Sequence, residues 1–285
     1  IFPQFMPITL KYWGLLLAAF ANTKMEQQLL TAKKPKVRYA LLDELRGFMV
    51  FCMIFYHAFF TVYDFFELPI SAELFEFFSP AEPFFAGGFI FLSGLMCGFS
   101  RSNTKRGLLT CGVALLVTAC TVLVDRLTGQ EVAIYFGILH LLGFGMLFCG
   151  LFDFALRRVN KWLGLGVSLA LFALLYGVPE NNFNFLNIRA HLSAGWGRLP
   201  GMFILGFTTD EFYSADYFPL LPWLFLFLAG YYAVKTGFIQ RFKGLFGPLR
   251  VKPLAFLGRH ALWVYLLHQP VILAVCFAVS ACLKR

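Results

Sequence analysis

The chain has 285 residues, of which 59% are hydrophobic and only 14% are charged. Soluble domains average about 45–50% apolar and about 25% charged residues, so this composition excludes an ordinary soluble enzyme and indicates a polytopic membrane protein. The net charge is +9, but Lys and Arg lie in short clusters between apolar runs. That arrangement is typical of loops that follow the positive-inside rule, and it argues against nucleic-acid binding.

The seven cysteines do not indicate a metal site or a disulfide framework. They lie mostly inside apolar runs and show neither a C-x-x-C motif nor the Cys/His spacing of metal ligands. In such surroundings cysteine behaves as a small apolar residue. We therefore predict that the protein binds no metal ion.

The beginning of the chain differs from the rest. Residues 1–36 hold one short apolar run and then a basic segment, so we interpret them as an N-terminal extension and basic flank. Residues 37–285 show no internal repeat and no low-complexity tract, and we predict that they form a single transmembrane domain. The basic flank is expected to stay in the cytoplasm, which places the N-terminus of the domain on that side.

Apolar runs approaching 20 residues recur along this domain, enough to cross a hydrocarbon core of about 30 Å. We predict an all-α transmembrane helix bundle of about seven spans, within a range of about six to eight, and more if the N-terminal segment crosses. The spans are expected at about residues 41–66, 84–99, 108–124, 132–156, 163–178, 217–234 and 254–282. Loops that are basic alternate with loops that are mixed or acidic, so consecutive spans run in opposite directions.

The first predicted span carries a cation and an imidazole among apolar residues. Ten residues separate Arg46 from His57, so the two side chains lie about three turns apart on one face of a helix. Ionisable groups inside a membrane cost at least ~2.5–3.5 kcal/mol, which makes each a candidate functional residue. Arg46 is either a phosphate clamp near the cytoplasm or a snorkelling residue paired with Asp43. His57 is our first candidate for a catalytic base or nucleophile.

Two further histidines lie within predicted spans. His140 is expected at a depth similar to that of His57, and its alternatives are a catalytic role or a hydrogen bond between helices. His268 precedes Gln269 and Pro270, where the proline frees a backbone carbonyl that a polar neighbour can satisfy. His268 is therefore either a substrate contact or a structural residue.

The sixth predicted span is preceded by a polar stretch, residues 179–216, that we place outside the membrane. Its apolar segment 199–207 is too short to cross, so we expect a re-entrant or interfacial piece. Asp216 at the start of the span is either a helix N-cap or a substrate contact. Trp223 suits an aromatic belt at the membrane interface and is a second candidate for substrate binding.

Several of these residues fall in blocks that together resemble a known family. The blocks are residues 42–47 (LDELRG), 89–94 (FIFLSG), 137–140 (GILH), 216–219 (DYFP), 257–259 (LGR) and 265–268 (YLLH). Their order resembles small bacterial members of the heparan-α-glucosaminide N-acetyltransferase catalytic family, within the transmembrane acyltransferases of the acyltransferase-3 type. The lysosomal enzyme of this family has long luminal segments that this chain lacks, so its heparan substrate is not carried over.

The resemblance implies a membrane acyltransferase that uses acetyl-CoA or another acyl-CoA from the cytoplasm and a sugar or glycan acceptor on the other side. Under this interpretation His57 and His140 are catalytic, and Arg46 and Arg259 bind the acyl-CoA. The implied location is the bacterial inner membrane. The expected partners are acyl-CoA, the acceptor and the lipid bilayer, with a homodimer left open.

Two alternatives stand beside the acyltransferase. In a proton-coupled permease, His57 and His140 would relay protons while Arg46 binds an anion. Such transporters usually show internal repeats or paired broken helices, and this sequence has one double-proline entry and one proline-interrupted span without matching halves. In the second alternative the histidines only hold helices together.

Overall fold

The computed structural model describes residues 39–66, 68–100, 102–129, 131–180, 182–185, 188–191, 195–247 and 250–283. They belong to one compact unit that begins at Tyr39. The predicted N-terminal extension, residues 1–36, lies outside the described residues.

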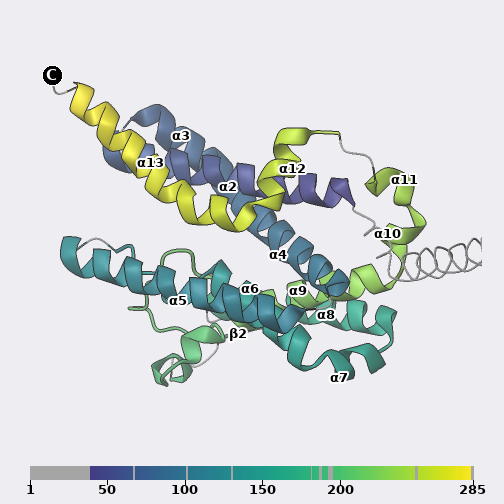
Figure 1. The fold of residues 1–285 in the computed structure, drawn as a ribbon. Helices are drawn as coiled ribbons and strands as arrows, with labels where there is room; N and C mark the ends of the chain where they lie inside the picture. Colours follow the sequence, from purple (N-terminus) through teal and green to yellow (C-terminus); the bar gives the residue numbers. More distant parts are fainter. Residues whose placement is uncertain are drawn as a thin grey trace, which may run out of the picture. The chain divides into compact units, whose positions relative to one another are not determined.

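The described residues are mostly helical (Figure 1). The helices are α2 (Ala40–Phe66), α3 (Pro69–Phe78), α4 (Glu82–Phe99), α5 (Asn103–Thr128), α6 (Ile138–Leu151), α7 (Asp153–Arg158), α8 (Lys161–Leu175), α9 (Leu220–Lys235), α10 (Phe238–Arg241), α11 (Lys243–Phe246), α12 (Lys252–Arg259) and α13 (Ala261–Leu283). Two short strands, β1 (Asn182–Phe185) and β2 (Ile188–His191), pair antiparallel in the long polar stretch.

Within the described part of the chain, five helical segments are long and apolar enough to cross a membrane. They are Ala40–Asp64, Pro69–Phe99, Asn103–Thr128, Lys161–Glu180 and Ala261–Cys282, and the shorter helices α6 and α9 are also apolar. Five long and two short segments make seven, the number expected from the sequence. The predicted all-α polytopic bundle is thus confirmed, and the protein is an integral membrane protein.

Helix contacts place α2 and α4 at the centre of the bundle. Helix α2 packs against α3, α4, α12 and α13, whereas α4 packs against α6 and α9 (Figure 1). Glycines allow the closest approach: a Cβ on Gly94 would meet the backbone of Phe227, and one on Gly230 would meet that of Phe91. Small residues at reciprocal positions let membrane helices approach backbone to backbone. The α4–α9 contact is therefore tight and fixed in register.

The fourth predicted span begins later than its apolar pattern indicates. Helix α6 starts at Ile138, and the residues before it are not helical. Their backbone N–H groups bond side chains instead: Val132 donates to Asp125 Oδ1 and Ile134 to Thr121 Oγ1, at 3.0 and 3.1 Å. Because α5 side chains satisfy these donors, the segment needs no helix of its own. Hydrophobicity alone cannot reveal such a partnership.

The last predicted span is divided at His260 into α12 and α13. A Cβ on Gly258 would meet the backbone of Asp43, and one on Gly47 would meet the backbone of Leu254. Helix α12 therefore lies directly on the first turns of α2. This contact holds the part of α2 that carries the predicted anion clamp.

Candidate active site

Two histidines from distant parts of the chain meet between α2 and α13. The ring centroids of His57 and His268 are 5.0 Å apart, with an angle of 51° between the planes. Both side chains are partly buried. One turn further along α2, the hydroxyl of Thr61 accepts a hydrogen bond of 3.0 Å from Gln269 Nε2. The two helices thus share a polar strip within an apolar surrounding.

The hydrogen bond of His268 determines its tautomer. Its Nδ1 lies 2.6 Å from the carbonyl oxygen of Tyr265. A carbonyl oxygen only accepts, so Nδ1 carries the proton and Nε2 of the neutral ring holds a lone pair. That Nε2 atom is buried and has no hydrogen-bond partner among the described residues. Few buried polar atoms in folded proteins lack a partner, so this atom is an exception to explain.

Tyr265 also links α13 to the loop before α9. Its hydroxyl donates to Asp216 Oδ2, and the same oxygen accepts from the backbone N–H of Ile138 at 3.1 Å. Asp216 therefore caps α6 rather than its own helix. Burial raises the pKa of this carboxyl, in the loop outside the helices, to about 7. The predicted substrate contact of Asp216 stays a prediction.

The backbone around Asp216 leaves little room. Asp216 has a φ of +53°, a left-handed conformation in which Asp and Asn are enriched among non-glycine residues. A Cβ on Gly137 would lie 2.5 Å from Asp216 Oδ2, so this position accepts only glycine without a shift. The Asp216 carboxyl is thereby held against the first turn of α6.

His140 differs from His268 in that both of its ring nitrogens form hydrogen bonds. Its Nδ1 accepts from the backbone N–H of Gly137 at 3.2 Å, and its Nε2 lies 3.3 Å from Thr118 Oγ1. The Thr118 hydroxyl gives its own proton to the carbonyl of Ile134 at 2.7 Å, so Nε2–H is the donor to Thr118. Both ring nitrogens are engaged. We interpret His140 as a helix cap, and its predicted catalytic role stays a prediction.

Arg46 lies on α2, about three turns before His57. Its guanidinium carbon is 5.5 Å from the ring centroid of Phe89 on α4, a cation–π contact. Its Nε is buried and has no hydrogen-bond partner among the described residues. The positive charge of Arg106 on α5 and the negative charge of Asp43 both act on this buried guanidinium. A buried guanidinium whose Nε–H has no partner, with a second cation close enough to act on it, is suited to binding an anion.

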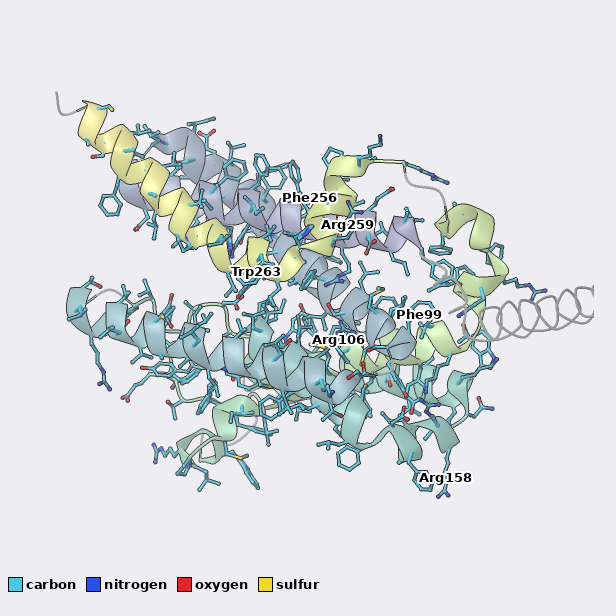
Figure 2. All side chains as sticks on the ribbon, in the orientation of Figure 1. Phe99, Arg106, Arg158, Phe256, Arg259 and Trp263 are labelled. Atoms are coloured by element: carbon cyan, nitrogen blue, oxygen red, sulfur yellow. The ribbon has the colours of Figure 1, made fainter. Side chains whose placement is uncertain are left out.

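Two further arginines, Arg106 and Arg259, are exposed. Figure 2 shows Arg106 on α5 and Arg259 at the end of α12. Arg259 was predicted to bind the donor, and this stays a prediction. Arg106 is not among the residues that the sequence predicts for the donor site, because it lies in a cluster of cations at the edge of an apolar run. Its proximity to Arg46 depends on helix packing that the sequence does not reveal.

Trp223 is part of the core rather than of an interfacial belt. It is buried, with 8% of its surface exposed, and its ring centroid lies 5.3 Å from that of Phe218 and 5.6 Å from that of Phe172. Substrate binding by Trp223 stays a prediction, and the packing gives it a structural role.

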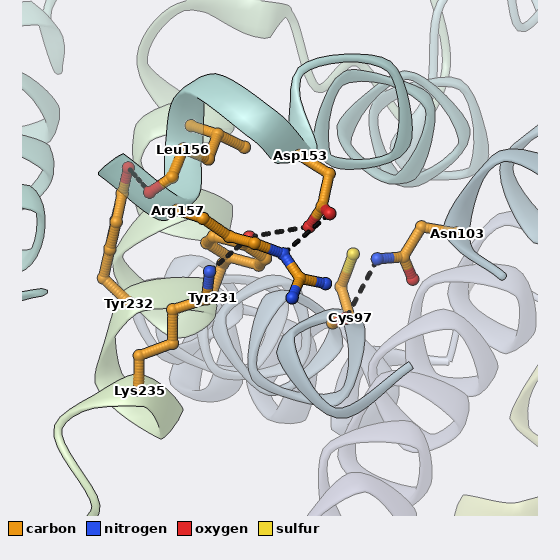
Figure 3. Close-up of polar contacts among 8 residues, drawn as sticks. All are labelled: Cys97, Asn103, Asp153, Leu156, Arg157, Tyr231, Tyr232 and Lys235. Atoms are coloured by element: carbon orange, nitrogen blue, oxygen red, sulfur yellow. Dashed lines mark hydrogen bonds and ion pairs between the residues drawn. The ribbon is translucent and has the colours of Figure 1, made fainter. Parts of the chain in front are cut away.

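A second polar cluster joins α7 to α9 (Figure 3). Lys235 Nζ donates to the Tyr231 hydroxyl at 2.5 Å, and that hydroxyl donates to Asp153 Oδ1 at 3.5 Å. Asp153 also pairs with Arg157 at 2.7 Å. The carboxylate and the cations satisfy one another, so we interpret this cluster as a structural clasp between helices.

Comparison with known proteins assigns the chain to a family. Residues 38–270 match the model of a family described as "Heparan-alpha-glucosaminide N-acetyltransferase, catalytic". No curated protein and no solved structure matches the chain. The matched range contains Arg46, His57, Asp216 and His268, and it covers most of the chain. The protein therefore belongs to the heparan-alpha-glucosaminide N-acetyltransferase catalytic family.

Proposed function

We propose that this membrane acetyltransferase moves an acetyl group from cytoplasmic acetyl-CoA to a sugar or glycan acceptor on the other side of the bacterial inner membrane. The reaction centre in this proposal is the pair formed by His57 and His268. The observation that carries it is the contact of two imidazoles, 5.0 Å apart, on two apolar helices of a chain from an acetyltransferase family. Ionisable groups in such helices generally mark functional sites.

Histidine suits the chemistry of acetyl transfer from a thioester. The acceptor nitrogen or oxygen forms a bond to the carbonyl carbon, and the bond from that carbon to sulfur breaks. The reaction needs a group that accepts a proton near neutral pH, or a nucleophile that holds the acetyl group between two steps. His57 can serve in either way, because a neutral imidazole has one nitrogen with a lone pair.

The donor site in this proposal lies around Arg46. Its buried Nε has no hydrogen-bond partner among the described residues, and the charges of Arg106 and Asp43 both act on it. Guanidinium groups bind phosphates through paired hydrogen bonds, and acetyl-CoA carries several phosphates. An anion between two arginines also removes their mutual repulsion. Arg259 is proposed as a third donor contact.

The spacing between Arg46 and His57 along α2 suits a donor whose phosphates bind at one end and whose acetyl group lies at the other. Arg46 and His57 are eleven residues apart, about 16 Å along the helix axis at about 1.5 Å per residue. The pantetheine arm of acetyl-CoA joins the phosphates to the thioester through a flexible chain. With the phosphates at Arg46, this arm carries the acetyl group toward the histidine pair.

Release of free CoA tests the proposal directly. The purified protein in lipid nanodiscs is given acetyl-CoA with a panel of amino sugars and glycans, and the free thiol is followed. We expect acceptor-dependent CoA release that His57→Ala abolishes and His260→Ala, an exposed histidine at the α12–α13 junction, leaves unchanged. Absence of acetyl-CoA binding, or full transfer by His57→Ala, would refute the proposal. Proton-coupled uptake without thioester turnover would instead support the permease.

A further inference from the structure

We propose that His268 is the general base of the transfer and that its Nε2 takes the proton released by the acceptor. This inference rests on the proposed acetyl transfer and divides the work between the two histidines. It follows from two features of the His268 ring. Nδ1 is hydrogen-bonded to a backbone carbonyl, whereas Nε2 is buried and has no hydrogen-bond partner among the described residues. His57 is then the histidine that faces the thioester.

The ring of His268 is held in one tautomer. The carbonyl of Tyr265, 2.6 Å from Nδ1, keeps the proton on that nitrogen. In the same way a partner on one ring nitrogen generally determines which tautomer a catalytic histidine adopts. Nε2 is consequently the atom that accepts a proton, and no rotation or tautomer exchange is needed before the reaction.

The Nε2 atom of His268 belongs to the polar strip between α2 and α13. Nε2 of His268 and Oε1 of Gln269 are both buried and both lack a partner among the described residues. Their residues face His57 and Thr61, which are one turn apart on α2. Two buried acceptor atoms on adjacent residues, both without a partner, suit a ligand that donates hydrogen bonds. An amine or a hydroxyl group of a sugar has this character.

His140 and His260 differ from His268 in their hydrogen bonds and their exposure. His140 uses both ring nitrogens in hydrogen bonds, so it has no free lone pair for a substrate proton. His260 bonds a backbone carbonyl through Nδ1, as His268 does, but its side chain is exposed at the end of α12. Among the described histidines, only His268 has both a tautomer fixed by a backbone carbonyl and a buried ring nitrogen without a hydrogen-bond partner.

Acetyl transfer requires only one general base, His268, to account for every bond and proton. The acceptor N–H or O–H loses its proton to Nε2 of His268 as its nitrogen or oxygen bonds the thioester carbon. The carbon–sulfur bond breaks, and its electron pair leaves on the sulfur of CoA. The proton then passes from His268 to this thiolate, directly or through water. The products are the acetylated acceptor and free CoA, and both histidines are neutral again.

Chemical rescue distinguishes a base from a structural residue. His268→Ala is assayed in single turnovers at saturating acetyl-CoA, with and without added imidazole, beside His57→Ala and the control His260→Ala. We expect His268→Ala to lower the transfer rate about 10²–10⁴-fold, the usual range for loss of a general base. Acetyl-CoA binding should stay within about threefold of wild type. Imidazole should restore transfer to His268→Ala but not to His57→Ala, with rescue that follows the basicity of substituted imidazoles.

A second variant covers the case in which alanine disturbs the fold. His268→Asn keeps an N–H group that can bond the Tyr265 carbonyl but offers no basic nitrogen, so it should bind acetyl-CoA and transfer as slowly as His268→Ala. Transfer by either variant within threefold of wild type would overturn the inference. So would rescue of His57→Ala alone, or a His268→Ala protein that binds acetyl-CoA and is not rescued. A wild-type protein without transfer activity would refute the proposed function instead.

Discussion

At the scale of single residues, the hydrogen bonds of each histidine decide what it can do. His140 and His268 are both surrounded by apolar helices. Both ring nitrogens of His140 form hydrogen bonds, whereas only Nδ1 of His268 does so. Burial alone therefore does not separate a structural histidine from a reactive one. The free nitrogen does, because proton transfer requires a lone pair within reach of the substrate.

Arg46 and Arg106 are expected to determine the affinity for the donor. Each hydrogen bond to a charged group contributes about 1.5–3 kcal/mol, which corresponds to about 10–100-fold in binding. Arg46→Gln and Arg106→Gln should each raise the dissociation constant of CoA by this factor, measured by calorimetry in detergent. Pantetheine, which has no phosphate, should bind both variants and wild type equally. Lys105→Gln, an exposed neighbour on α5, is the matched control, and equal CoA affinities in all four proteins would contradict the phosphate site.

Asp216 is expected to make the stability of the protein depend on pH. Burial raises its pKa from 3.8 to about 7, so the folded protein retains a proton that the unfolded chain loses. The stabilising contribution is complete below pH 3.8, declines as the pH rises, and is gone above about 7. A shift of this size corresponds to about 4 kcal/mol.

Thermal unfolding between pH 4.5 and 8 measures this dependence. The melting temperature of wild type should fall more steeply toward pH 7 than that of Asp216→Asn, since asparagine does not ionise and tolerates the left-handed backbone. Asp64→Asn removes an exposed carboxyl at the end of α2 and should follow wild type. Parallel curves for wild type and Asp216→Asn would rule out a role for this carboxyl.

At the scale of elements, backbone contacts at glycine fix the position of α12 on α2. A Cβ at Gly258 would overlap the backbone of Asp43, whereas one at Gly112 on α5 would meet no atom within 4 Å. Gly258→Ala should therefore lower the free energy of unfolding by about 1–3 kcal/mol through overpacking. Gly112→Ala should be neutral or slightly stabilising, because alanine favours helices.

The same pair of variants tests whether α12 supports the donor site. Gly47 adjoins Arg46, so displacement of α12 should also weaken CoA binding in Gly258→Ala while Gly112→Ala binds normally. Unfolding is followed by thermal melting and binding by calorimetry. If the two variants melt at the same temperature, the close contact between α2 and α12 does not contribute to stability.

At the scale of the whole molecule, the sequence determines the membrane segments better than it determines their contacts. The first span was expected at 41–66 and is observed at Ala40–Phe66, because an uninterrupted apolar run leaves few choices. The start of α6 at Ile138 was missed, since the residues before it depend on side chains of α5. The contact of His57 with His268 joins residues 211 positions apart, and no periodicity encodes such a pairing.

The orientation of the whole molecule leads to a prediction about sidedness. The loops expected in the cytoplasm carry the cations Lys105, Arg106, Arg157, Arg158, Lys235 and Arg241. Arg46 lies toward the same end of α2, whereas His57 lies three turns further along the helix. Acetyl-CoA should therefore act only from the cytoplasmic face, and a membrane-impermeant acceptor only from the opposite face.

Sealed membrane vesicles of known orientation measure this directly. Right-side-out vesicles loaded with acetyl-CoA should acetylate an impermeant acceptor added outside, whereas the reversed arrangement of donor and acceptor should give no product. Inverted vesicles should show the opposite preference. In the proposed reaction the two substrates reach one histidine pair from different sides. Transfer that is equal in both arrangements would instead mean that donor and acceptor enter by the same face. The donor site would then have to be sought away from Arg46.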